Sequence, residues 1–149
     1  MYLLSAFQEF PDIPRMTARY QKAAALMTAP SEIFNRREPY MFGTTSMWYL
    51  FYRTPGKMME TADQLRDMLE VYNPLTGNHG AGAYELYLDE ALSVQGRFDE
   101  SDIYAHQAAL LSEQWQNATV TYGAALLLGI NANLPVGHDL PAKAIEYPG

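Results

Sequence analysis

The stretch PLTGNHGAGAYELYLDEAL, residues 74–92, places three glycines and His79 just before an apolar helical pattern. A phosphate-binding loop needs such glycines between a buried strand and a helix, but the residues before Gly77 have helical spacing. Gly77 or Asn78 can adopt the positive φ that ends a helix, and the two later glycines let the next helix begin against a neighbour. We therefore interpret the stretch as a corner between two helices of an all-α fold.

Apolar residues recur at helical spacing along the chain and predict about seven helices. Asp12 is suited to capping the first of them and Asp99 a later one, and a helix is expected to stop before Pro135. The expected helices cover residues 13–27, 45–53, 57–72, 83–95, 100–115, 120–134 and the stretch from 139. The apolar run at 45–53 is too dense to show a period, so a strand is the alternative there.

Turn residues recur at a nearly constant interval. Pro14, Gly56, Gly96 and Gly137 are separated by 42, 40 and 41 residues, and each is expected to precede a helix. A period of about 40 residues is typical of stacked helix hairpins. The pattern predicts one domain over 1–149, with units at about 1–33, 44–73, 80–116 and 118–147. The last unit is incomplete, so we expect the chain to belong to a longer helical array.

The composition excludes several classes of protein. The 149 residues are 48% apolar and 18% charged, which is typical of a globular domain. No cysteine is present, so disulfides, thiolate zinc sites and cysteine nucleophiles are excluded, and a cytoplasmic location is the simpler expectation. The N-terminus lacks signal-peptide features. The longest apolar run is well short of the ~20 residues that cross a membrane, so no membrane association is expected.

The charge balance argues against nucleic-acid binding. Ten basic residues stand against 17 acidic ones, which gives a formal charge of −7. Nucleic-acid affinity depends mostly on basic groups that contact phosphates. We therefore predict that this chain makes no direct contact with nucleic acid.

The segment GRFDESDIYAHQAALL, residues 96–111, resembles a tetratricopeptide-type repeat. Its glycine ends one helix and Phe98 follows two residues later. Ser101, Ala105 and Ala108 are the small residues at which paired helices approach closely. The resemblance implies antiparallel helix hairpins stacked in a right-handed superhelix.

Two longer strings are similar to a more specific family. PYMFGTTSMWYLFYRTPGKM (39–58) and YNPLTGNHGAGAYELYLDEALSVQGRFDESD (72–102) resemble the MalT-like helical-repeat region of LuxR-type bacterial transcriptional regulators. Such regulators carry an ATP-binding domain before the repeats and a helix-turn-helix domain after them. This sequence contains neither a G-x-x-x-x-G-K-[ST] loop nor a basic recognition helix. The resemblance implies a sensor and protein-contact segment, with DNA bound by a helix-turn-helix domain outside it.

In repeats of this kind the first helix of each pair lines a concave groove. The residues predicted to bind a ligand or partner there are Ser46, Tyr49, Arg53, His79, Tyr87 and Glu90. They combine aromatic and polar side chains, so we expect a protein or small-molecule effector. Aromatic residues also crowd positions 40–52, where a contact between chains would bury them, and a homo-oligomer is one expected arrangement.

The sequence shows no arrangement typical of catalysis. The three histidines share no ligand spacing with one another or with carboxylates, whereas zinc sites need three or four converging ligands. Asp99 and Glu100 are explained by a helix start, where negative charge complements the helix dipole. We expect no catalytic residue, no metal and no cofactor.

Three functional hypotheses follow. The first is the non-catalytic sensor segment of a LuxR-type regulator. The second is a stand-alone helical-repeat adaptor or scaffold, which a helix-turn-helix domain downstream of residue 149 would exclude. The third is an enzyme, which would require convergent titratable groups that the sequence does not display.

Overall fold

The structure, a computed structural model, describes residues 1–34, 52, 54 and 56–138, and from 134 onward the backbone alone. These residues form six α-helices and a short 3-10 helix and contain no strand, which confirms the all-α prediction. The elements are α1 (Tyr2–Ala6), η1 (Phe7–Glu9), α2 (Ile13–Ala24), α3 (Lys57–Leu75), α4 (Ala83–Ser93), α5 (Phe98–Gln114) and α6 (Ala118–His138). The predicted helices at 45–53 and from 139 lie outside the described residues.

The start of α2 follows from its sequence. The Asp12 side chain accepts a hydrogen bond from the Arg15 backbone N–H at 3.1 Å, which confirms the predicted cap. Pro14 lies in the first turn, where its missing N–H costs nothing. Met16 and Tyr20, one turn apart, are buried on the face that α2 presents to its neighbours.

The helix α3 begins after Gly56, which has a φ of +79°. Its apolar residues lie on one face and are buried, as their spacing predicts: Met58, Ala62, Leu65, Met68, Leu69 and Tyr72. The acidic and basic residues between them form the solvated face. The amphipathic pattern of this segment is therefore enough to orient the helix.

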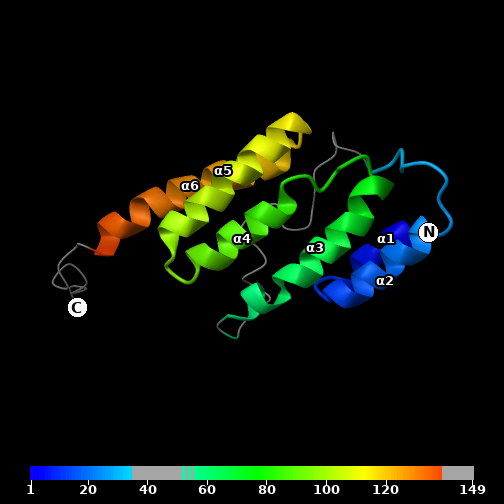
Figure 1. Cartoon of the computed structure of the whole chain (residues 1–149), viewed down its shortest axis with the longest axis horizontal. Coiled ribbons are helices and arrows are strands. Elements are labelled where there is room, and N and C mark those ends of the chain that lie inside the picture. The colour runs from blue at the N-terminus through cyan, green and yellow to red at the C-terminus, as the bar shows by residue number, and fades with distance from the viewer. Residues whose placement is uncertain (35–51, 53, 55, 139–149) are drawn as a thin grey trace, which may run out of the picture.

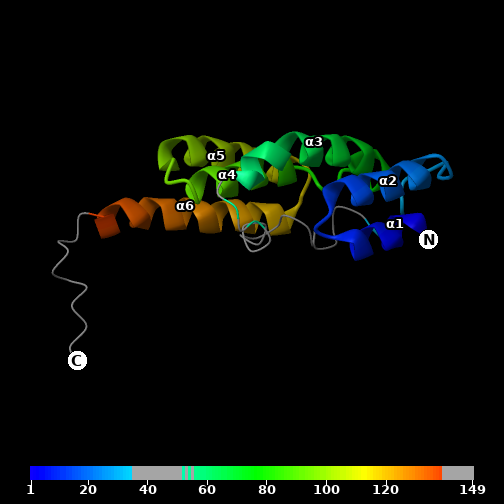
Figure 2. The same cartoon turned by 90° about the horizontal axis from the view of Figure 1, so that it is seen from below.

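The helices form two groups that meet at α3 and α4. The first group contains α1, α2 and α3, and the second contains α4, α5 and α6 (Figure 1). Seen from below, α6 runs beneath α4 and α5, while α1 lies beneath α2 (Figure 2). One continuous apolar core includes residues from both groups, such as Tyr20, Tyr72, Leu86 and Val120.

The central element of the fold is α4. It contacts α3 on one side and both α5 and α6 on the other. Consecutive residues from Leu86 to Leu92 are consequently buried, and this run includes two carboxylates, Asp89 and Glu90. Helical periodicity alone would place some of these side chains on a solvated face. Contacts with α3, α5 and α6 cover that face between Leu86 and Leu92.

Two predicted helix ends differ from the structure. The helix α5 begins at Phe98 with Arg97 in the capping position, so Asp99 lies inside the first turn and is not the cap. The helix α6 does not stop before Pro135 but continues to His138. A proline inside a helix removes one backbone hydrogen bond. One turn earlier, the Asn131 side chain bonds to Ser93 of α4 and Ser101 of α5.

The turn residues that suggest a 40-residue repeat have mixed outcomes. Gly56 and Gly96 both have positive φ and precede helices. Gly137, in contrast, lies within α6 and is not a turn, because that helix extends past the predicted stop. The short N-terminal helix α1 is not among the predicted helices.

Candidate functional site

The glycine-rich stretch is a helix corner, as the sequence predicts. Gly77 and Asn78 both have positive φ, at 60° and 63°. The Asn78 backbone N–H donates to the Asn73 carbonyl at 2.9 Å, which satisfies a carbonyl at the end of α3. The Asn73 side-chain oxygen accepts from the Gly80 N–H at 3.1 Å, which fixes the second half of the turn.

The corner ends at Gly82, where α4 passes very close to α5 and α6. Gly82 has a φ of +82° and precedes the first residue of α4. A Cβ atom there would lie 2.8 Å from the Ala108 carbonyl oxygen and 3.0 Å from Val120 Cγ1. Glycine is therefore required both by its backbone conformation and by the space available.

His79 lies inside the corner and is buried. The Tyr72 hydroxyl is 2.6 Å from its Nδ1 atom, and the Asn117 side chain donates to its backbone carbonyl at 2.7 Å. The Phe34 ring lies beside it, with centroids 6.3 Å apart. These contacts connect the end of α3 to the start of α6 through one histidine.

The other described residues of the predicted site are also enclosed. Tyr87 is fully buried, and its hydroxyl donates to the Met58 carbonyl at 3.0 Å and lies 2.8 Å from Thr61 Oγ1. Burial raises the pKa of this hydroxyl. Glu90, one turn further along α4, is 2% exposed.

The structure therefore describes only part of the predicted groove. His79, Tyr87 and Glu90 lie within the packed helices rather than on an open surface, because α4 is covered on both sides. Ser46, Tyr49 and Arg53 lie outside the described residues. The expectation that these six residues bind an effector stays a prediction.

An open cleft lies beside the corner, between the second half of α3 and the start of α4. Its volume is about 500 Å³. Its polar lining residues are Arg66, Glu70, Asn73, Asn78, Tyr84 and Glu85. This cleft was not predicted from the sequence. The available signal is the spacing of Arg66 and Glu70, which places them one turn apart on the solvated face of α3.

A second polar cluster joins α4, α5 and α6. Ser101 Oγ bonds to Asp89 Oδ1 and donates to the Asp89 carbonyl at 3.0 Å. Asn131 Nδ2 donates to Ser101 Oγ at 2.7 Å and to Asp102 Oδ1 at 2.9 Å, and Asn131 Oδ1 accepts from Ser93 at 2.7 Å. One residue from each of three helices thus meets at the Ser101 hydroxyl.

Asp89 in this cluster is fully buried, and its Oδ2 atom has no hydrogen-bond partner among the residues that the structure describes. Burial raises the pKa of its carboxyl to about 7, while the hydrogen bond from Ser101 acts in the opposite direction. The burial of Asp89 was not predicted from the sequence. Among the described residues there is no group of three or more histidines and carboxylates that could hold a metal ion.

The outer face of α6 is apolar. Tyr122, Leu126 and Ile130 follow one another at intervals of one turn and are 63%, 37% and 38% exposed. A shallow hollow of about 460 Å³ on this face is lined by Ala125, Leu126, Gly129, Ile130 and Asn133. The sequence from 118 to 137 contains no Asp, Glu, Lys or Arg, so this stretch of α6 contributes no such charged side chain to the surface.

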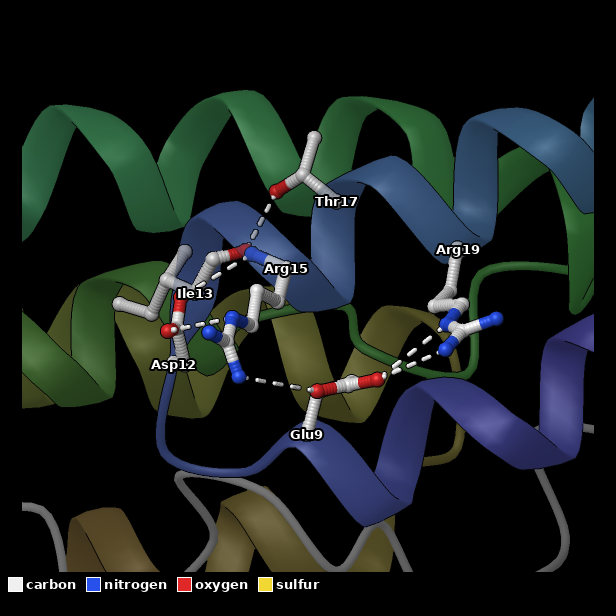
Figure 3. Close-up of polar contacts among 6 residues, drawn as sticks. All are labelled: Glu9, Asp12, Ile13, Arg15, Thr17 and Arg19. Atoms are coloured by element: carbon white, nitrogen blue, oxygen red, sulfur yellow. Dashed lines mark hydrogen bonds and ion pairs between the residues drawn. The ribbon is translucent and has the colours of Figure 1, made fainter.

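Charged side chains instead cover the N-terminal end of α2. The Glu9 carboxylate accepts from Arg19 at 3.0 Å and lies 3.9 Å from Arg15, which in turn pairs with Asp12 at 3.3 Å (Figure 3). The Thr17 hydroxyl donates to the Ile13 carbonyl within the same helix. The arginines pair with acidic neighbours, so this surface offers no concentrated positive field to an anion.

Comparisons of the chain with protein-family models, curated proteins and solved structures found no match. None of the helices in the described part of the chain is long and apolar enough to cross a membrane.

Proposed function

We propose that this chain is a non-catalytic protein-interaction segment whose contact surface is the outer face of α6. The exposed row of Tyr122, Leu126 and Ile130 carries this proposal. A helix that is apolar all round is normally buried all round, whereas among the described helices α6 contacts only α4 and α5, and the row of Tyr122, Leu126 and Ile130 stays exposed. Ala125 and Gly129 leave a hollow between the larger side chains, into which the ridge of a partner helix can pack.

The arrangement of the buried polar groups supports a non-catalytic role. His79 contacts Tyr72, and Asn117 bonds to the backbone of the corner. Ser101 and Asn131 bond to each other and to neighbouring carboxylates. These groups connect helices to one another, and none of them lines the open cleft.

The wider context that we propose is the sensor region of a LuxR-type regulator. The helix corner, the buried small residues Ser101, Ala105 and Ala108, and the two similar strings support it. We propose that the hairpins stack as in tetratricopeptide repeats, in a right-handed superhelix. In this proposal the segment acts in the cytoplasm, where the absence of cysteine is easily explained, and a separate helix-turn-helix domain contacts DNA.

The contact surface can be tested by site-specific photo-crosslinking in the cells that naturally make the protein. With p-benzoylphenylalanine at Leu126, we expect a discrete crosslinked product with a partner protein or a second copy. Gln64, exposed on the charged face of α3, is the control position. If Leu126 gives no more product than Gln64, α6 does not carry the contact and the proposal is wrong.

The regulator context can be tested separately from the contact. We expect the natural reading frame to encode a helix-turn-helix domain downstream of the codon for Gly149. A frame without that domain, together with a positive crosslink at Leu126, would instead support the alternative of a stand-alone helical-repeat adaptor.

A further inference from the structure

The cleft beside the helix corner has walls from two helices and the turn between them. Arg66 and Glu70 come from α3, Asn78 from the turn, and Tyr84 and Glu85 from the first turn of α4. Its volume of about 500 Å³ is in the range of ligand-binding sites, and it opens to solvent along one side. The hydrogen bonds of the corner connect the end of α3 to the turn that leads into α4.

The charge in this cleft is unbalanced. Its one cation among the described residues, Arg66, lies 3.0 Å from Asp63 and 3.7 Å from Asp67 on its own helix. Glu70 and Glu85 line opposite walls, and neither forms an ion pair in the described part of the chain. The cleft therefore has more acidic than basic side chains around it, in a chain with a net charge of −7. The N-terminal dipole of α4 offsets part of the charge of Glu85, which lies in the first turn of that helix.

The environment of Glu85 strengthens the attraction between its carboxylate and a cation. Partial burial raises the pKa of its carboxyl, because the charged form has lost some of its hydration. Opposite charges attract more strongly where water is partly excluded. The neighbouring Tyr84 is also partly buried, which raises the pKa of its hydroxyl. Its ring supplies an aromatic surface for the stem or head of a basic side chain.

Asn78 adds a polar group of a different kind. Its side chain lines the cleft and forms no hydrogen bond within the described residues, while its backbone is held by the turn. A side-chain amide can donate to a carbonyl and accept from an N–H, which are the two groups of a peptide backbone. A free metal ion or small amine could use only the oxygen of this amide, whereas a peptide backbone can pair with both its oxygen and its NH₂ group.

We propose that this cleft binds an arginine- or lysine-containing extended segment of a partner protein, with Glu70 and Glu85 on either side of the basic side chain and Asn78 on the peptide backbone. The inference rests on the proposed function as a protein-interaction segment and assigns that partner a basic segment. Complementary charge favours this occupant over an acidic or apolar one, and it also accelerates encounter with a basic partner.

The test uses fluorescence anisotropy with a labelled, terminally blocked peptide of alternating alanine and arginine. The reference is the same peptide with citrulline, which keeps the shape of arginine and removes its charge. We expect the citrulline peptide to bind about tenfold more weakly or worse, because charge-assisted hydrogen bonds are lost. A chain that binds neither peptide, or binds both equally, would contradict the proposal.

Variants locate the binding on the protein. We expect the double variant Glu70→Gln and Glu85→Gln to lower the affinity for the arginine peptide about tenfold or more. Asn78→Ala should lower this affinity by a smaller factor. The double variant Asp99→Asn and Glu113→Gln, at two exposed acidic residues of α5, removes the same number of charges and should change affinity by less than about twofold. An unchanged affinity in the double variant of Glu70 and Glu85 would place the peptide elsewhere and overturn the assignment.

Two further outcomes separate this proposal from others. Free arginine amide that binds as tightly as the peptide would identify a small cation as the occupant, and the peptide assignment would be wrong. If Leu126 crosslinks but no variant of the cleft affects peptide binding, the cleft proposal is wrong and the contact on α6 stands. If Leu126 does not crosslink but the cleft variants weaken peptide binding, the contact on α6 is wrong and the basic partner stands.

Discussion

The group formed by α1, α2 and α3 differs from the group formed by α4, α5 and α6 in what connects its helices. In the first group, apolar side chains such as Met16 and Met68 fill the interior, and the charged pairs around Glu9 stay at the surface. In the second, buried polar side chains such as Ser101 and Asn131 lie between the helices. Polar contacts of this kind depend on distance and angle, so they restrict helix placement more than apolar packing does.

The difference has a physical cause in the spacing of the helices. Ala105 and Ala108 of α5 are fully buried and leave little side-chain volume between α5 and its neighbours. The backbone of α4 therefore comes close to α5, as the contact at Gly82 shows. Where backbones approach this closely, short polar side chains can reach across, and a buried polar atom that loses its partner is costly. We therefore expect the second group to be more sensitive to single substitutions.

The largest expected effect is at Gly82. Gly82→Ala places a methyl group 2.8 Å from a backbone oxygen at a positive φ, so we expect the free energy of unfolding to fall by about 4 kcal/mol. Urea denaturation followed by circular dichroism measures this. The control is Gly77→Ala, which has a positive φ but an open surrounding, with an expected loss of about 1 kcal/mol. Equal losses in the two variants would show that close helix approach is not important here.

The second effect concerns pH. The pKa of Asp89 rises from 3.8 to about 7 on folding, so the folded chain binds the additional proton. The free energy of unfolding should therefore decrease as the pH rises from about 4 to about 7 and then show no further change from this group. Asp89→Asn should remove this decrease and stabilise the chain at pH 8 by at most roughly 4 kcal/mol, since the pKa rises by about three units and each unit corresponds to about 1.4 kcal/mol.

The control for Asp89 is Asp99→Asn, at an exposed position of α5, which should retain the decrease in stability with rising pH. Urea titrations at several pH values, with all three proteins compared, provide the measurement. A wild-type stability that increases from pH 4 to pH 7 while Asp89→Asn shows the same increase would contradict the assignment.

The third effect is at Asn117, which connects the corner to α6. Its side chain donates to the His79 carbonyl at 2.7 Å and accepts from the Val120 N–H at 3.3 Å. Asn117→Ala removes both bonds and leaves a buried carbonyl without this donor, so we expect a loss of about 2 kcal/mol. The control is Asn133→Ala, at an exposed position of α6 where the side chain donates to the Gly129 carbonyl of the same helix. It should change stability by less than about 0.5 kcal/mol, and thermal unfolding of the two variants in parallel compares them.

The smallest effect is expected in the first group, at the ion pair between Arg19 and Glu9. Arg19→Met keeps the aliphatic stem and removes the charge, and we expect a loss of about 0.5 kcal/mol at low salt. High salt should abolish most of this difference, because exposed charges are screened. A loss as large as that of Asn117→Ala would mean that the first group also depends on polar contacts, and the comparison between the groups would no longer hold.

Much of the fold could be predicted from local patterns. The corner at residues 76–82, the Asp12 cap and the buried face of α3 depend on residues within one or two turns of each other. The small residues Ser101, Ala105 and Ala108 are buried as the sequence predicts. Local signals were insufficient at Asp99 and at the end of α6, where several start or stop positions are compatible with the same residues.

The candidate sites were less predictable than the helices. His79, Tyr87 and Glu90 have the aromatic and polar character of a binding surface, and the structure encloses all three. The cleft beside the corner was missed because Glu70 and Glu85 belong to different helices, and the sequence does not state how closely those helices approach.

Helix formation, the corner and the absence of strands among the described residues follow from residue types and their spacing, because backbone preferences and amphipathic periodicity act over a few neighbouring positions. The burial of Asp89, the meeting of three helices at Ser101 and the pairing of two acidic walls in one cleft follow from packing between segments distant in the chain. Periodicity indicates which face of a helix is apolar, but α4 is covered on several sides, and that depends on how many helices surround it.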